Sequence, residues 1–309
     1  MLRRQLFWLS LILIASLAPA PLLWAQTNQT AAPAAAAPAP TNQTSPAGET
    51  PADEASRQLS SEEILAELNK KAQEGDPEAM MLLGALFERA SIITFRNYGT
   101  ALDWYKKAAA KGLAQAYYNV GICYEVGQGT PPDDKAAFQN YQKAAQAGLR
   151  EANFKLGLFY LQGLGTPANV KQGLDFLTKA ASSGYPPAQN ELGIIYILGQ
   201  WDQNRDERKA FDLFSKGAQQ GFSESMKNLG VIFRDGLGRP TNNLQALKWF
   251  LLARTYGGSS PQLQMSIDNL SQKLKPAEVT AAEKEATAWR DSQIKNVQAL
   301  AEAQRRNAD

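Results

Sequence analysis

The chain has 309 residues, of which 32 are Lys or Arg, 30 are Asp or Glu and none is His. Without histidine it lacks the commonest general base and metal ligand, which excludes Ser/His and Cys/His catalysis, and we expect no metal and no cofactor. The net charge of +2 gives no electrostatic footprint for nucleic acid. The single cysteine, Cys123, cannot form an internal disulfide and lies in an apolar stripe, so we expect it in the core.

Residues 1–25 have the pattern of a secretory signal peptide. Two arginines precede an apolar run over residues 6–17, and small residues and prolines follow. This run of 12 residues is shorter than the roughly 20 that a membrane-spanning helix needs. We therefore expect an exported protein, periplasmic or secreted, with cleavage near residue 25. The alternative is an uncleaved N-terminal segment that anchors the chain.

Residues 26–59 are rich in Ala, Pro, Thr, Asn and Gln and are predicted to be a disordered linker. The folded part is expected to begin at residue 60, where Ser60 and Glu63 match a capping box. The helix that follows should end at Gly75. Because it has no preceding partner helix, we expect it to cover the N-terminal end of the array described next.

Two sets of glycines recur at steps of 36 or 37 residues through the next part of the chain. Two landmarks that keep one period indicate an array of repeated supersecondary units. The first set follows an apolar residue and is Gly84, Gly121, Gly157, Gly193 and Gly230; the second closes each unit and is Gly75, Gly112, Gly148, Gly184 and Gly221. The units are predicted at residues 77–112, 113–148, 149–184, 185–221 and 222–258.

Each unit is predicted to be a pair of antiparallel helices. In the second unit, Ala116, Val120 and Cys123 share one helical face. Glycines and prolines over residues 127–132 then interrupt the pattern. A second apolar stripe follows and ends at Gly148, as expected just past a helix end. Small residues in both stripes let the two backbones approach closely.

The C-terminal part continues as helices. Apolar residues recur at helical spacing over residues 262–274, and Pro276 suits the first turn of another helix. We expect residues 276–309 to fold back onto the fifth unit as a capping helix, which leaves residues 60–275 for the repeat array.

The motif AxxxLGxxYxxGxG followed by KAxxxYxKAAxxG resembles the Sel1-like repeat, a relative of the tetratricopeptide repeat. The resemblance covers five copies from about residue 77 to 258. The first copy has RASIITFRN where the GxG loop belongs, and the fourth has Trp201 in place of the second glycine, so we expect reshaped loops there. The resemblance implies an all-α fold: a right-handed α-solenoid of five helix-turn-helix repeats with N- and C-terminal capping helices and a concave groove.

The resemblance also implies that the first helix of each hairpin presents residues to this groove, at the positions two before, two after and five after the leucine of the LG pair. We expect the middle position either to line the groove or to pack between hairpins, and Tyr118, Phe154, Leu161 and Ile197 to be the apolar anchors. Acidic residues at one end and basic residues at the other would set the direction of a bound peptide. The candidate groove residues are Met81, Glu88, Tyr118, Glu125, Phe154, Leu161, Asn190, Ile197, Lys227 and Arg234.

The predicted function is that of an exported, non-catalytic scaffold or adaptor that binds a protein or peptide in the groove, in the bacterial cell envelope. The alternative is a serine hydrolase or a penicillin-recognising (beta-lactamase-like) enzyme. Its only sequence support is an SxxK match at Ser292 and Lys295. No KTG or SDN element accompanies the match, which favours chance.

Overall fold

The computed structural model describes residues 61–89 and 96–306. These residues form thirteen α-helices and no strand, so the predicted all-α helical-repeat fold is confirmed. The predicted signal peptide, residues 1–25, and linker, residues 26–59, lie outside the described residues. The helices are α3 (Ser61–Gln73), α4 (Pro77–Arg89), α5 (Tyr98–Ala110), α6 (Ala114–Val126), α7 (Asp134–Gln146), α8 (Arg150–Gln162), α9 (Val170–Ser182), α10 (Pro186–Leu198), α11 (Glu207–Gln219), α12 (Ser223–Asp235), α13 (Asn243–Gly257), α14 (Pro261–Lys273) and α15 (Pro276–Arg306).

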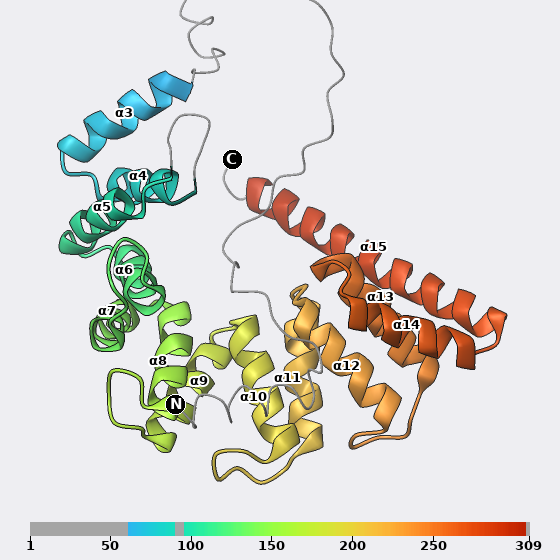
Figure 1. Cartoon of the computed structure of the whole chain (residues 1–309). Coiled ribbons are helices and arrows are strands. Elements are labelled where there is room, and N and C mark those ends of the chain that lie inside the picture. Colours follow the sequence, from blue (N-terminus) through green and yellow to red (C-terminus); the bar gives the residue numbers. More distant parts are fainter. Residues whose placement is uncertain (1–60, 90–95, 307–309) are drawn as a thin grey trace, which may run out of the picture.

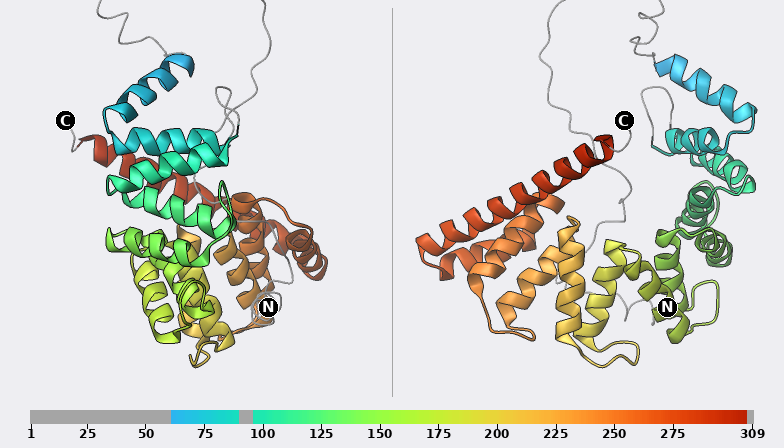
Figure 2. Two further views of the ribbon diagram at one scale, coloured as in Figure 1. Left: turned by 60° about the vertical axis from the view of Figure 1, so that its left-hand side comes forward. Right: turned by 180° about the vertical axis from the view of Figure 1, so that it is seen from behind.

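The helices from α4 to α13 form five hairpins, each with a first helix (α4, α6, α8, α10 or α12) and a second helix (α5, α7, α9, α11 or α13). The hairpins stack side by side into a curved solenoid, with α3 at one end and α14 and α15 at the other (Figure 1). Figure 2 shows the same arc from two other directions, with α15 lying along the C-terminal hairpin.

The boundaries of the helices follow from local chemistry that recurs in every repeat. Each second helix begins after an Asn or Asp whose side chain caps it; Asp133, for example, accepts the N–H of Ala136 at 3.0 Å. The first helices α6, α8, α10 and α12 end at a glycine in the left-handed conformation. The five caps are Asn97, Asp133, Asn169, Asp206 and Asn242.

The glycine of the LG pair is where the two helices of a hairpin come into contact. A Cβ atom built on Gly121 would lie 2.6 Å from the ring of Tyr141, which is fully buried. Only glycine leaves room for a large side chain at this point. The same contact recurs in the other repeats, where Gly84, Gly157, Gly193 and Gly230 face Tyr105, Leu177, Phe214 and Phe250.

The loop of the fourth repeat is reshaped, as expected. In the second, third and fifth repeats the second loop glycine has a positive φ, for example 63° at Gly165, where a Cβ would lie 2.2 Å from the carbonyl oxygen of Asp134. Trp201 and Asp202 adopt φ values of 56° and 59°, which side-chain-bearing residues rarely do. The loop of the first repeat falls on residues 90–95, which lie outside the described residues.

Both ends of the array are covered by helices. At the N-terminal end α3 packs against α4 and buries Ala72. At the C-terminal end α15 packs on α13, where the ring of Trp289 lies 5.7 Å from that of Trp249 and 5.9 Å from that of Tyr256. The expectation that the last helix folds back onto the fifth repeat is therefore confirmed. Within residues 61–89 and 96–306, no helix combines the length and apolarity needed to cross a bilayer.

Candidate functional site

The first helices of the hairpins line the inner side of the arc. Direct side-chain contacts join them: Lys155 on α8 reaches Glu125 on α6 at 2.9 Å, and Asn228 on α12 reaches Asn190 on α10 at 2.9 Å. Equivalent helices of a curved stack come closest on its shorter side, and α10 and α12 also contact each other directly. We call the surface formed by α4, α6, α8, α10 and α12 the inner face.

Three of the four expected apolar anchors are core residues. The side chains of Phe154, Leu161 and Ile197 are only 9%, 3% and 6% exposed. Leu161 points between the two helices of its hairpin, because a Cβ on Gly173 of α9 would lie 2.7 Å from it. The expectation that these three side chains would be free to anchor a partner was therefore wrong. Tyr118 stays half-buried, with its ring 5.6 Å from that of Tyr141.

Four of the apolar side chains that remain accessible occupy the middle position of the motif. All four are half-buried, whereas the residues five after the leucine in the third and fourth repeats are buried. They follow one another along α6, α8, α10 and α12 and form what we call the apolar row. Its members are Ile122, Leu158, Ile194 and Val231.

The acidic residues predicted for one end of the groove form hydrogen bonds and an ion pair with other residues of the array. The hydroxyl of Tyr105 donates to Glu88 at 2.5 Å, and the hydroxyl of Tyr141 donates to Glu125. Glu125 also accepts two 2.9 Å hydrogen bonds from Lys155, whose side chain is almost fully buried. Burial, reinforced by the Glu88 carboxylate, raises the pKa of Tyr105 far above its usual range, so its proton stays in place.

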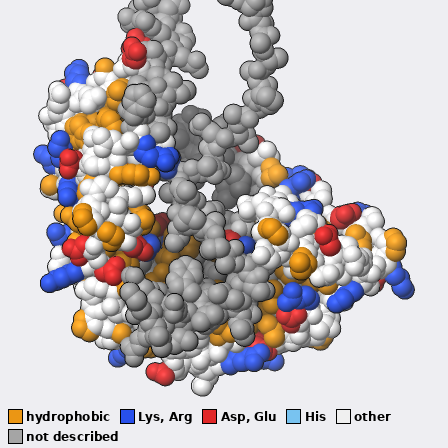
Figure 3. Space-filling model, viewed as in Figure 1, with side chains coloured by type: hydrophobic (Ala, Val, Ile, Leu, Met, Phe, Trp, Pro, Cys, Tyr) orange, Lys and Arg blue, Asp and Glu red, His pale blue; other side chains and the backbone are white. Residues whose placement is uncertain are grey.

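The basic residues predicted for the other end are also paired. Lys227 bonds to Glu224 at 2.7 Å, and Arg234 makes a bidentate pair with Asp235 at 2.7 and 2.8 Å. In Figure 3 basic and acidic side chains are interspersed over both arms of the visible face. The described charges therefore do not give the groove the expected acidic and basic ends. Met81 is half-buried near the N-terminal end.

A fourth position on the inner face was missed from the sequence: the residue immediately before the leucine of the LG pair. In the third and fifth repeats it is Lys155 and Asn228, which both contact the preceding first helix. In the fourth repeat it is Glu191. Residues at this position differ in charge and polarity from repeat to repeat, and comparing this position across the repeats would have revealed them: Leu82, Asn119, Lys155, Glu191 and Asn228.

Glu191 lacks the partner that this position has in the neighbouring repeats. Lys155 pairs with Glu125, but the residue equivalent to Glu125 in the next repeat is Leu161, which has no charge. Among the described residues the Glu191 carboxylate forms no hydrogen bond or ion pair. Burial raises the pKa of Glu191 to about 7, because a charged carboxylate loses hydration there without compensation.

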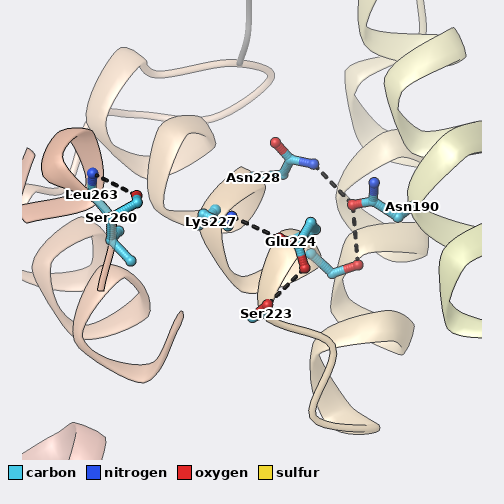
Figure 4. Close-up of polar contacts among 8 residues, drawn as sticks. Asn190, Ser223, Glu224, Lys227, Asn228, Ser260 and Leu263 are labelled. Carbon is cyan, nitrogen blue, oxygen red and sulfur yellow. Dashed lines mark hydrogen bonds and ion pairs between the residues drawn. The ribbon is translucent and has the colours of Figure 1, made fainter. Parts of the chain in front are cut away.

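The side-chain amide of Asn190, the residue before Glu191, is bonded to that of Asn228, and the pair leaves one NH2 group and one oxygen free (Figure 4). The oxygen of Asn190 accepts from the Asn228 amide at 2.9 Å and from the Ser225 hydroxyl at 3.3 Å. The NH2 group of Asn190 and the oxygen of Asn228 have no partner in the described chain. Turning both amides by 180° exchanges their roles but again leaves one NH2 group and one oxygen free.

The groups that an enzymatic alternative would need lie elsewhere. Ser292 is exposed on α15, and its hydroxyl donates to the carbonyl oxygen of Trp289 at 2.6 Å. Cys123 is 3% exposed, and burial raises the pKa of its thiol to about 12, so it is not a reactive thiolate. The described residues hold no cluster of three or more Cys, Asp or Glu side chains that could bind a metal ion.

The repeat pattern matches a known family over more than half of the chain. The Sel1 repeat is found at residues 77–113, 114–149, 150–185, 186–222 and 223–254. A curated Mus musculus protein, DAP3-binding cell death enhancer 1, is 39% identical over 66 residues, which are 18% of this chain and 13% of that protein. Its Rattus norvegicus counterpart is 38% identical over 66 residues. The chain thus matches only a small part of the length of these relatives.

Solved structures share the fold. The protective antigen c5321 of uropathogenic Escherichia coli, described as displaying an SLR fold, superposes with a TM-score of 0.61 at 27% identity, over 72% of this chain and 48% of that one. A Sel1 repeat protein from Oxalobacter formigenes gives a TM-score of 0.56 at 24% identity, over 74% of this chain and 96% of that one. Sel1 repeats generally mediate protein–protein interaction and are generally non-catalytic. The chain belongs to the Sel1 repeat family.

Proposed function

We propose that this protein is an exported adaptor that binds a segment of another protein along its inner face. The observation that carries the proposal is the pairing, on one surface, of a half-buried apolar row with polar atoms that have no partner. The row is Ile122, Leu158, Ile194 and Val231, and the unpartnered polar groups belong to Asn190, Glu191 and Asn228.

The apolar row supports binding because each of its side chains still has area to bury. Covering apolar surface stabilises a complex by about 25 cal/mol per Å² before the cost of association is subtracted. Binding energy usually concentrates in a few central residues. We therefore expect Ile194 and Val231, which flank the unpartnered polar groups on α10 and α12, to contribute most.

Export is supported by the leader pattern of residues 1–25. N-terminal sequencing of the protein purified from its own host tests it: cleavage near residue 25 is expected. Retention of Met1 in a membrane fraction that resists high salt would instead favour the anchored form.

A photo-crosslinking residue tests the inner-face proposal. p-Benzoylphenylalanine replaces Ile194 on α10 in one version and Gln139, exposed on the second helix α7, in the other. After irradiation in the native host, we expect a discrete product with a defined partner from position 194 only. Products of equal yield from position 139, or none from 194 while 139 reacts, would move the binding surface to the outer side.

A further inference from the structure

If the inner face binds a protein segment, as proposed above, its polar atoms decide which kind of segment fits. The side-chain oxygen of Asn190 already accepts one hydrogen bond from the Asn228 amide and a second from the Ser225 hydroxyl. The 9% exposure of Asn190 shows that the pair sits low on the surface, beneath anything that covers α10 and α12. A ligand therefore meets the NH2 group of Asn190 and the side-chain oxygen of Asn228.

A free donor group and a free acceptor group at the two ends of the bonded amide pair can both bond to the main chain of an extended peptide. Each residue of such a chain offers one N–H and one C=O, whereas a helix uses these groups internally. A covered amide that finds no partner costs on the order of 1–3 kcal/mol, so the pair disfavours purely apolar occupants. This argues for an extended segment rather than an amphipathic helix at this part of the inner face.

The carboxylate of Glu191, the residue that follows Asn190, indicates one side chain of the bound segment. Between α6 and α8, the side chain of Lys155 forms an ion pair with Glu125. Glu191 occupies the position of Lys155 on the next first helix, but Leu161 stands where a charged partner would be. The array thus holds a half-buried carboxylate without its cation. Lys227, a base on α12, is already bonded to Glu224 at 2.7 Å.

We infer that the inner face between α8 and α12 binds an extended segment of a partner protein whose main chain bonds to Asn190 and Asn228 and whose Lys or Arg side chain pairs with Glu191. A cation at this place restores the hydrogen bonds that burial denies the carboxylate. The raised pKa of Glu191, about 7, agrees with a site that lacks its counter-charge.

Selection of displayed random peptides against the purified protein tests this chemistry. The selected peptides are expected to share one Lys or Arg at a fixed place, and to crosslink to p-benzoylphenylalanine at position 194. Peptides that crosslink there without a shared basic residue would overturn the inference while leaving the proposed inner-face binding intact. A selection that returns no peptide crosslinked at this position would contradict both.

Two variants separate the side-chain contact from the main-chain contact. Glu191→Gln keeps the shape of the side chain, and we expect it to weaken the basic peptides about tenfold while sparing versions in which the basic residue is norleucine. Asn228→Leu should weaken both kinds of peptide alike. Asp103→Asn, at an exposed carboxylate on α5, is the charge-matched control and should change neither. Equal losses for the two peptide kinds in Glu191→Gln would refute the pairing.

Discussion

Replacing Glu191 with Gln should stabilise the folded protein at alkaline pH and much less at acid pH. Burial raises the pKa of this carboxyl from 4.5 to about 7, so the folded state holds its proton where the unfolded state has lost it. Because the folded pKa is the higher one, stability is greatest below pH 4.5 and falls as the pH rises to about 7. Above about pH 7 the folded protein bears the full free-energy cost of the ionised Glu191 carboxylate.

The size of the penalty follows from the shift. At roughly 1.4 kcal/mol for each pKa unit, a rise from 4.5 to about 7 corresponds to about 3 kcal/mol at pH 8 and to about 1 kcal/mol at pH 5. The amide that replaces the carboxyl in Glu191→Gln does not titrate, so the variant should gain about 2 kcal/mol on the native chain between these two pH values. Any constant effect of the amide itself cancels in this difference.

Urea denaturation at pH 5 and pH 8, followed by circular dichroism at 222 nm, measures the effect. Asp103→Asn, at an exposed position on α5, serves as the control and should give the same difference from the native protein at both pH values. A stability difference between Glu191→Gln and the native chain that does not change with pH would refute the account of an unpaired, half-buried carboxylate.

Three further changes test the packing. Gly121→Ala should lower the melting temperature, because its Cβ would lie 2.6 Å from the Tyr141 ring. This clash should outweigh the helix propensity of alanine, which is about 1 kcal/mol better than that of glycine. An unchanged or higher melting temperature would contradict the contact. Phe154→Ala should lower the free energy of unfolding by about 3 kcal/mol, as expected for a core residue, and a loss below about 1 kcal/mol would show that Phe154 does not pack in the core. Removing residues 276–309 should lower the melting temperature by exposing the face under α15, whereas removing residues 26–58 should leave it unchanged, and equal effects would disprove the cap.

The fold was predictable because its signals are local and repeated. A glycine such as Gly121 recurs where a large side chain enters between two helices, and an Asn or Asp such as Asp133 recurs where the second helix of a hairpin begins. Each of these residues has the same structural role in every repeat in which it occurs. Five copies of the same spacing therefore predict the helical hairpins without any knowledge of long-range contacts.

The site was harder to predict because neighbouring positions on one helix differ little in sequence. Leu158 and Leu161 are the same residue type three positions apart, yet Leu161 is buried against α9 and Leu158 remains half-exposed. Which of the two faces the groove depends on the rotation of the helix against its partner. Similarly, the sequence predicted Glu125 to be a charge that lines the groove, whereas the structure places its carboxylate in contact with Tyr141 and Lys155.

The fourth repeat shows both what the sequence revealed and what it did not. Trp201, in the place of a glycine, predicted a changed loop, and the loop is changed. The free charge of Glu191 could not be foreseen, because it depends on a substitution one repeat earlier, where Leu161 stands at the position that is Glu125 in the second repeat. Pairings between repeats are visible only when the register between stacked helices is known.

Cysteine footprinting tests most directly whether the inner face is the binding surface. The native Cys123 is buried and its thiol pKa is raised to about 12, so maleimide labelling reports only on an introduced cysteine. With a selected or crosslinked partner bound, labelling of Ile194→Cys on α10 is predicted to slow at least about tenfold, while labelling of Gln139→Cys on α7 stays unchanged. Unchanged labelling at position 194 together with protection at position 139 would contradict the account.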